Sequence, residues 1–267
     1  MYERTAVLLA SVFADTHPDI GDIMRKLIVG IFTSFLAVAP IAKAQMLGPE
    51  FASDYNVTSL GSVPSLPSNY GGLTFLNNST LLIGGAANTA SGRIYTIGVL
   101  RGTDNHITGF SGTAQLFLGG SIGTYNDGGV VFGPGGVLFT SQWPVNQLGQ
   151  TKPGSTVEDK VIDLATLGVA SSHSALGFVP AGFGGAGQIK LVSYAAGQWY
   201  SGNLAPDGSG TYDIVDLAQV DVDNTLTGTQ SLVGGPEGFT YLASGNKGFA
   251  TNSLLLSEYQ AGIISAY

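Results

Sequence analysis

A short pattern of small, apolar and aromatic residues recurs four times along the chain. Two small residues lead in three of the four copies, an apolar residue follows, and an aromatic residue comes two positions later. Residues two positions apart lie on the same face of a strand, so each copy predicts a strand with its apolar and aromatic side chains on one side. The copies are residues 71–75, 128–132, 174–178 and 237–241.

Further apolar runs follow each copy in a constant order, and Gly, Asn and Asp separate them as in tight turns. A second run lies at residues 81–83, 137–139, 189–192 and 254–256. A third lies at 93–97, 198–200 and 263–267, and is unclear in the second unit near 141–148; a fourth lies at 114–118, 161–164 and 212–215. The aromatic ends of the copies are 57, 46 and 63 residues apart, close to the roughly 40–50 residues of a propeller blade. The sequence therefore predicts an all-β fold, a β-propeller with four recognisable blade units.

The fourth unit stops after its third apolar run, at Tyr267. Residues 56–60 precede the first copy and could supply the closing strand. Either the four units close on themselves, or the chain is truncated at its C-terminus. We expect truncation, because the chain ends on an apolar strand without a polar tail. Residues 161–169 are the best short helical candidate after Gln45.

The N-terminal region has the three parts of a secretory signal peptide. A basic start at residues 24–26 precedes an uncharged apolar run at 27–39, and residues 42–44 form a small-x-small cleavage site before Gln45. The apolar run is shorter than the roughly 20 residues of a membrane span. We therefore expect a misplaced upstream start at 1–23, a signal peptide at 24–44 and a propeller domain at 45–267. Such a protein is exported to the periplasm, the cell surface or the medium, and keeps no transmembrane span.

Composition excludes several functions. The net charge is −8, and the 10 Lys and Arg residues form no cluster after the signal peptide, so neither nucleic acid nor an anionic membrane is an expected partner. The chain has no Cys, which excludes thiol catalysis and thiolate metal sites. The 40 Gly residues occur beside 44% hydrophobic residues, which favours packed sheets joined by tight turns over disorder.

Three C-terminal segments, residues 236–242, 254–259 and 262–267, resemble exported bacterial β-propeller proteins that often carry a PEP-CTERM sorting tail. They are more distantly similar to NHL-type and gluconolactonase-type propellers. The resemblance implies a propeller over residues 45–267, and most exported propellers of this kind have no assigned activity. The Pro-Glu-Pro tail does not occur in this sequence.

The first strand of each propeller blade lines the central channel, which makes the start of each copy the candidate site. The expected channel residues are Asn69, Tyr70, Asn126, Asp127, Ser172, His173 and Glu237. Gluconolactonase-type propellers place a Glu beside a Gly at the start of a blade, where it binds a divalent cation, and Glu237 matches that position. Asp127 and Asn126 would add hard oxygen ligands that suit calcium. Alternatively, these residues only hydrate a polar channel mouth, since Asn and Asp also favour turns.

Two functions remain open. The first is a non-catalytic exported propeller that acts as a scaffold or binding module for a cell-surface or matrix partner, and the scarcity of catalytic residue types favours it. The alternative is a calcium-dependent lactone or ester hydrolase with its site in the channel. In that alternative Glu237, Asp127 and Asn126 hold the metal, and His173 acts as the base that activates water.

Overall fold

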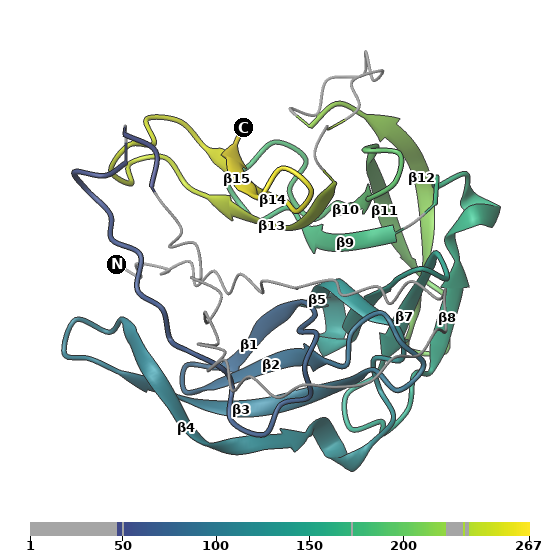
Figure 1. Ribbon diagram of the computed structural model, residues 1–267. Coiled ribbons are helices and arrows are strands. Elements are labelled where there is room, and N and C mark those ends of the chain that lie inside the picture. The colour runs from purple at the N-terminus through teal and green to yellow at the C-terminus, as the bar shows by residue number, and fades with distance from the viewer. Residues whose placement is uncertain (1–46, 50, 172, 223–231, 233–234) are drawn as a thin grey trace, which may run out of the picture. The chain divides into compact units, whose positions relative to one another are not determined.

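The computed structural model describes residues 47–49, 51–171, 173–222, 232 and 235–267 (Figure 1). Of these, residues 47–49 and 51–58 belong to one compact unit, and the described residues from 59 onward belong to another. In the described part of the smaller unit, Phe51 and Tyr55 pack edge to face with ring centroids 6.3 Å apart. The predicted upstream segment and signal peptide lie outside the described residues.

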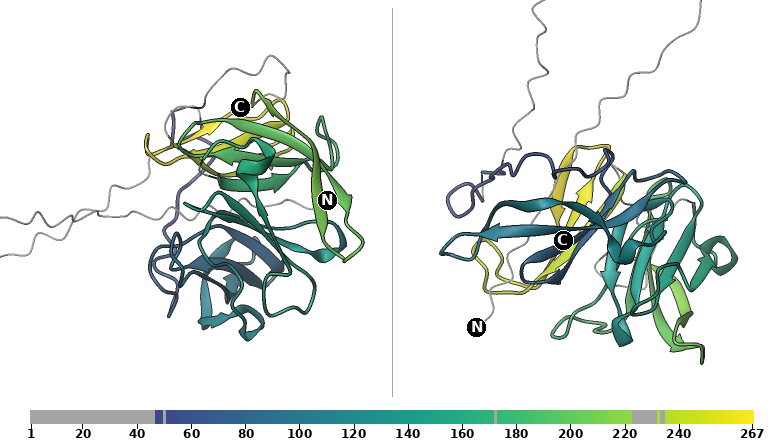
Figure 2. Two further views of the ribbon diagram at one scale, coloured as in Figure 1. Left: turned by 90° about the vertical axis from the view of Figure 1, so that its right-hand side faces the viewer. Right: turned by 90° about the horizontal axis from the view of Figure 1, so that it is seen from below.

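Four antiparallel sheets form the larger unit, and they are arranged as a four-blade β-propeller (Figures 1 and 2). Each blade runs from an inner strand outward in chain order. The first blade holds β1 (Leu73–Asn77), β2 (Thr80–Gly85), β3 (Arg93–Arg101) and β4 (Ile107–Leu116), and the second β5 (Asn126–Phe132), β6 (Leu138–Gln142), β7 (Gln147–Thr151) and β8 (Lys160–Asp163). The third holds β9 (His173–Phe178), β10 (Ile189–Ser193), β11 (Trp199–Pro206) and β12 (Tyr212–Val220), and the fourth β13 (Pro236–Leu242), β14 (Ser253–Glu258) and β15 (Ile263–Ala266). The predicted all-β propeller and its four units are confirmed.

The helices of the described residues are three 3₁₀ turns, η1 (Phe117–Gly119), η2 (Pro134–Gly136) and η3 (Leu164–Leu167). No helix in this part of the chain has the length and apolar character needed to cross a membrane. The short helix expected at 161–169 is wrong at its start, because residues 160–163 pair with β7 as β8. The Asp163 side chain then accepts a hydrogen bond from the Ala165 N–H and begins η3, which ends at Gly168 with φ 80°.

Other strand predictions need correction. The unclear third strand of the second unit is β7, and the strand expected at 114–118 is the end of the longer β4, followed by η1. Residues 56–60, proposed as a closing strand, form no strand. Alternation gives each face of that segment a single apolar side chain, Val57 or Leu60, so neither face could bury an apolar stripe.

The hydrophobic core lies between neighbouring blades. Each of three interfaces has its own buried cluster, drawn from the sheets on both sides. Between the first and second blades these residues include Leu82, Ile94, Val130 and Leu138; between the second and third, Phe139, Leu148, Leu176 and Ile189; and between the third and fourth, Ala175, Val192, Trp199 and Leu256. Three of the four recurring aromatics, Phe132, Phe178 and Tyr241, pack against these clusters, and Phe178 meets Phe139 with ring centroids 5.2 Å apart. Burial between blades therefore explains the aromatic position of the repeat.

The small residues of the repeat allow the inner strands to approach backbone to backbone. A Cβ atom built on Gly72 would lie 2.6 Å from the Gly128 carbonyl oxygen, and one on Gly129 would lie 2.6 Å from the Leu176 nitrogen. The Gly72 N–H donates to the Asp127 carbonyl oxygen over 2.6 Å. The leading pair of small residues thus has a packing role at the centre of the propeller.

Two buried hydroxyls connect neighbouring blades near this centre. Ser141 on β6 accepts a hydrogen bond from the Gly129 N–H and donates to the Ser174 carbonyl oxygen, both over 2.7 Å. Ser174 on β9 donates to the Pro236 carbonyl oxygen over 2.8 Å. Each hydroxyl therefore joins its own blade to the next one.

Candidate functional site

The candidate residues share one end of the propeller, which we call the entry end. Close contacts place Gly72 beside Gly128 and Gly128 beside Gly238, so the inner strands run side by side in the same direction. Successive strands of a blade are antiparallel. The starts of the inner strands, the connections into them, and the turns between the second and third strands of each blade therefore lie at the entry end.

Asp127 and Glu237 lie next to each other at the entry end, and they are the two predicted residues that the structure brings together. Asp127 is the second residue of β5 and is 7% exposed; Glu237 is the second residue of β13 and is half-buried. Their strands touch, because a Cβ atom on Gly128 would lie 3.0 Å from the Gly238 nitrogen and 3.5 Å from the Glu237 carbonyl carbon. The backbones next to the two acids are therefore in contact, and the charge of Glu237 acts on Asp127.

Burial dominates the electrostatics of this pair. It raises the pKa of Glu237 to about 7. Burial also raises the pKa of Asp127 well above its ordinary value, and the charge of Glu237 raises it further. Because each carboxylate disfavours a negative charge on its neighbour, the two groups resist being ionised together. Within the described residues, no Lys, Arg or His forms an ion pair with either carboxyl group.

Hydrogen bonds to Asp127 come from the backbone and from one amide. The Gly128 N–H and the Asn88 side chain stabilise the ionised form of Asp127 and oppose the increase in its pKa. With its amide nitrogen turned toward β5, Asn88 donates to Asp127 Oδ1 and to the Asn126 carbonyl oxygen, each over 3.2 Å. Asn88 is exposed, so the polar path from Asp127 leads toward solvent.

Asn126 does not line an open channel, as the sequence analysis expected. Its side chain is fully buried, and Nδ2 donates to the Gly123 carbonyl oxygen over 2.7 Å. Its Oδ1 has no hydrogen-bond partner and lies against Gly71 and Gly84, where a Cβ atom would come within 2.2 Å and 1.9 Å of it. The contacts with these two glycines place the amide against the backbone of the first blade.

His173 is also buried rather than exposed in a channel. It is 0% exposed, and its backbone N–H donates to Asn146 Oδ1 over 2.9 Å. Neither ring nitrogen has a hydrogen-bond partner. Burial lowers the pKa of His173 to about 3, and the nearby Val192 backbone opposes that decrease only weakly. The ring is therefore neutral near pH 7 and out of contact with solvent.

The predicted ligands do not gather into a larger metal-binding group. In the described ranges, no three His, Asp or Glu side chains lie close enough together to hold a metal ion. Of the other expected channel residues, Asn69 is exposed, Tyr70 is half-buried and accepts a hydrogen bond from the Val63 N–H, and Ser172 lies outside the described residues.

Sequence reasoning did not group together a set of aromatic side chains that lie at the entry end. In three successive blades the turn between the second and third strands carries one: Trp143, Tyr194 and Tyr259. Trp143 and Tyr194 are half-buried and Tyr259 is 42% exposed. Half-buried Tyr125 precedes β5, and its carbonyl oxygen accepts from the Trp143 N–H over 2.9 Å. Because Trp143, Tyr194 and Tyr259 occupy the same turn of the repeat, the sequence could have indicated that they lie at one end of the propeller. The other tryptophan, Trp199, is 1% exposed and belongs to the core.

Tyr194 and Tyr259 both approach the start of β13. A Cβ atom on Gly235 would lie 2.7 Å from the Tyr194 ring, and the Tyr259 N–H donates to the Gly235 carbonyl oxygen over 2.8 Å. Gly235 is two residues before Glu237. Along the chain, Tyr125 thus precedes Asp127 by two residues, while Tyr194 and Tyr259 contact the residue two positions before Glu237.

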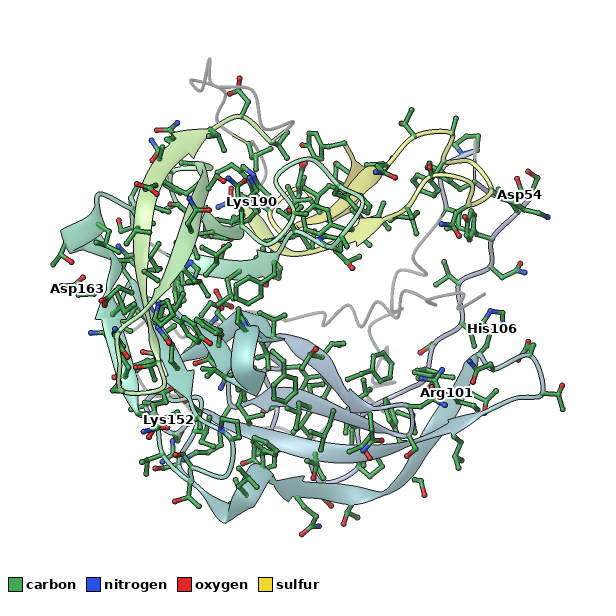
Figure 3. All side chains as sticks on the ribbon, turned by 180° about the vertical axis from the view of Figure 1, so that it is seen from behind. Asp54, Arg101, His106, Lys152, Asp163 and Lys190 are labelled. Atoms are coloured by element: carbon green, nitrogen blue, oxygen red, sulfur yellow. The ribbon has the colours of Figure 1, made fainter. Side chains whose placement is uncertain are left out.

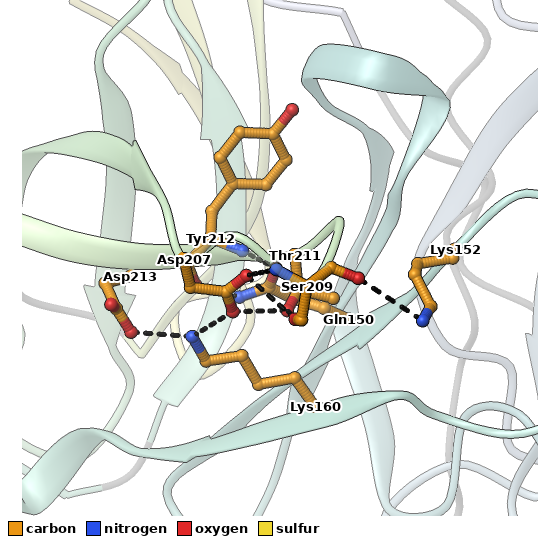
Figure 4. Close-up of polar contacts among 8 residues, drawn as sticks. All are labelled: Gln150, Lys152, Lys160, Asp207, Ser209, Thr211, Tyr212 and Asp213. Atoms are coloured by element: carbon orange, nitrogen blue, oxygen red, sulfur yellow. Dashed lines mark hydrogen bonds and ion pairs between the residues drawn. The ribbon is translucent and has the colours of Figure 1, made fainter.

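A second polar cluster joins the second and third blades and lies on their outer strands (Figure 4). Lys160 Nζ is 2.8 Å from Asp207 Oδ2 and 2.6 Å from Asp213 Oδ1. The Lys160 side chain, followed by the Thr211 hydroxyl and the Ser209 backbone, lowers the pKa of Asp207. Because its carboxylates already hold the Lys160 ammonium group, this cluster serves as an inter-blade ion pair.

Arg101 and Lys190 lie in different parts of the propeller (Figure 3), and each has a local partner. Arg101 lies at the end of the β3–β4 hairpin, opposite to the entry end, and covers the Phe75 ring with its guanidinium carbon 5.3 Å from the centroid. In the third blade, Lys190 is 2% exposed and donates to Ser201 Oγ over 2.7 Å. Burial lowers the pKa of Lys190 to about 8.

No protein-family model matches the sequence, and no curated protein matches it. Three similar solved structures are a 6-phosphogluconolactonase-like protein of Bacteroides uniformis, virginiamycin B lyase of Staphylococcus aureus, and a 6-phosphogluconolactonase-like protein of Bacteroides fragilis. The identities are 14%, 13% and 15%, with TM-scores of 0.39, 0.36 and 0.32. The matches cover 78%, 75% and 73% of this chain and 57%, 70% and 55% of the other chains. This chain thus spans little more than half the length of either lactonase-like protein.

Proposed function

We propose that this protein is an exported, non-catalytic β-propeller that acts as a binding module, and that the entry end is its ligand surface. One observation carries the proposal: within the described residues, the carboxyl groups of Asp127 and Glu237 have no cationic partner, and partly buried aromatic side chains lie at the same end of the propeller. Buried charge without compensation is costly to folding, and a bound partner would offset that cost. The predicted signal peptide at residues 24–44 supports export.

The placement of His173 supports binding over catalysis. A general base must reach the proton that it removes, directly or through one water molecule. The His173 ring is fully buried, and its pKa of about 3 makes it a weak base. The residue that the sequence suggested as a base therefore lacks the access that hydrolysis requires.

A calcium-dependent lactone or ester hydrolase is the second candidate. The approach of Asp127 to Glu237 favours it, since carboxylates are the ligands that calcium prefers. Calcium takes 6–8 oxygen ligands, and these two residues fit only part of such a shell. Bound calcium would supply Lewis-acid activation of a carbonyl group.

The two candidates can be separated with the full-length protein. We would measure turnover of a panel of lactones and esters, with calcium and with a chelator, for the wild type and for Glu237→Gln and His173→Gln. We expect no turnover above background in any sample. Calcium-dependent turnover that both substitutions abolish would overturn the binding proposal and establish the hydrolase.

A further inference from the structure

We propose that the outer edge of β15 pairs with β15 of a second copy of this chain, antiparallel and about a two-fold axis at Ser265. The inference concerns self-association and does not depend on the proposed binding function. It rests on an open strand edge whose donors, acceptors and exposed apolar side chains are complementary to themselves.

β15 occupies the place of a third strand and lies at the outer margin of the fourth blade (Figure 1). In the first three blades the third strand pairs with a fourth, whereas within the described residues β15 pairs with β14 alone. Its side chains reflect this position, since Ile263 is 52% exposed and Ile264 and Tyr267 are each 41% exposed. An exposed apolar edge of this kind is a template for pairing with another chain.

The backbone of β15 presents two residues at this edge. Leu254 and Tyr267 exchange both backbone hydrogen bonds. Alternation along the strand therefore turns the N–H and carbonyl groups of Ser265 toward β14, and those of Ile264 and Ala266 away from it. Each of the two outward residues thus offers one donor and one acceptor to a neighbouring strand.

One register satisfies every outward group. When Ser265 faces Ser265 of the second copy, Ile264 lies opposite Ala266 on each side of the axis, and both pairs exchange both of their backbone hydrogen bonds. A register in which Ile264 faces Ile264 would need the Gly262 N–H, which already donates to the Glu258 carbonyl oxygen over 2.9 Å. The two-fold axis therefore belongs at Ser265.

The exposed side chains match in the same register. Ile263 lies opposite Tyr267 of the second copy in a non-hydrogen-bonded pair, where facing side chains are closest. Aromatic and β-branched side chains stabilise a sheet when they face each other in this way. The Tyr267 hydroxyl donates to Glu258 Oε1 over 2.7 Å, which fixes the ring beside the strand. A second copy supplies all these groups without help from any other sequence.

Charge favours this edge over the outer strands of the other blades. Residues 259–267 contain no charged side chain and no Pro, so two copies can approach there although the net charge of the chain is −8. By contrast, β8 and β12 carry charged side chains, and Gly112, with φ 75°, interrupts β4. Charges and irregularities of this kind protect strand edges from pairing.

A short strand makes a weak dimer. β15 has 4 residues, too few to bury the roughly 800 Å² per partner of a standard interface. We therefore expect a monomer–dimer equilibrium that shifts with protein concentration. Sedimentation equilibrium of the full-length protein from about 1 μM to 1 mM covers the dissociation constants of weak complexes.

A cysteine at the axis tests the register. The chain has no Cys, so Ser265→Cys introduces a single thiol. Facing residues of a non-hydrogen-bonded pair have Cα atoms about 4.5 Å apart, within the range that a disulfide spans. With oxidised glutathione as the oxidant, we expect a disulfide-linked dimer and two molecules of reduced glutathione. Ser111→Cys, at an exposed position on β4, is the matched control and should stay mostly unlinked.

A backbone change tests the hydrogen bonds. Ile264→Pro removes an N–H that faces away from β14, so the bonds to β14 remain while the dissociation constant should rise at least about tenfold. Ile264→Val keeps the N–H and the β-branched shape, and it should leave the dimer intact. Melting curves show whether each variant is folded.

Three results would overturn the inference. These are a monomer at every concentration, equal cross-linking of Ser265→Cys and Ser111→Cys, or a dimer that Ile264→Pro leaves unchanged, which would place the interface elsewhere. A monomer whose Ile264 and Ala266 amides resist deuterium exchange would also refute the second copy and would assign the edge to another occupant. In the proposed dimer, exchange at these two amides slows as the protein concentration rises.

Discussion

Replacing Gly72 by Ala tests whether the inner strands really depend on backbone contact. Gly72 is buried, and the added methyl group would lie 2.6 Å from the Gly128 carbonyl oxygen, 2.7 Å from its carbonyl carbon and 2.9 Å from the Val130 nitrogen. All three are backbone atoms, which cannot rotate away as a flexible side chain can. The first and second blades must therefore separate locally to admit the methyl group.

The cost can be worked from this geometry. Overpacking of a close-packed region costs about 1–3 kcal/mol. Separation of the strands also stretches the hydrogen bond from Gly72 N–H to the Asp127 carbonyl oxygen, which adds about 0.5–1.5 kcal/mol. The free energy of unfolding should fall by about 2–4 kcal/mol, and the Tm by about 5–15 °C for a domain of this size.

Urea denaturation and thermal melts of the full-length protein measure both quantities. Gly109→Ala on the outer strand β4 is the control, since its new Cβ atom would meet only Leu100 Cδ1 at 3.9 Å. The control should stay within about 0.5 kcal/mol of wild type. If Gly72→Ala also stays within that range, the inner strands tolerate separation and the packing explanation of the repeat is wrong.

Three further predictions follow from the polar contacts. The pKa of Glu237 rises on folding from 4.5 to about 7, so this group stabilises the folded state below the unfolded pKa, and that stability is lost as pH rises through 7. Glu237→Gln should therefore stabilise the protein by up to about 3 kcal/mol at pH 8 and little at pH 4. In the same urea titrations, Asp104→Asn, which removes an exposed acid from the β3–β4 hairpin, should show no such gain. Ser141→Ala should cost about 2–3 kcal/mol in the same assay, because its two buried partners on β5 and β9 lose a hydrogen bond; an unchanged midpoint would mean that other groups satisfy them. Lys160→Met removes the cation that lowers the pKa of Asp207; the stability deficit relative to wild type should shrink as pH falls below the ordinary value of 3.8 and in 1 M salt, and a deficit independent of both would point to lost packing.

The repeat in the sequence predicted the inner strands because it reflects two strong requirements of the fold. Gly128 and Gly129 stand where backbones touch, and Phe132 and Phe178 fill the spaces between blades. Both requirements act on single positions and recur in each blade. The outer strands were placed less accurately, as β4 shows, because their exposed faces leave a weaker apolar pattern.

The candidate site was predictable only in part. The position of Asp127 and Glu237 at the starts of inner strands indicated their proximity. Burial was not predictable, because the expectation of an open channel assumed space where the inner strands are in contact. His173 and Asn126 were therefore assigned to a channel, although both are completely buried. The pairing of Lys160 with Asp207 brings together residues 47 positions apart, and no local pattern records it.

The cross-blade hydrogen bonds at the centre also define how the molecule should exchange its amide protons. The Gly72 N–H donates to Asp127 in the next blade, and the Gly129 N–H donates within its own blade to the Ser141 hydroxyl, which bonds to the third blade, so deuterium should reach both amides only when blades come apart. Leu254 and Tyr267 exchange both backbone hydrogen bonds, and alternation along β15 therefore turns the N–H groups of Ile264 and Ala266 away from β14. Deuterium should enter these outward amides without any separation of the blades. Comparing the two pairs of amides would thus measure the opening of the ring against the opening of a single strand within one native sample.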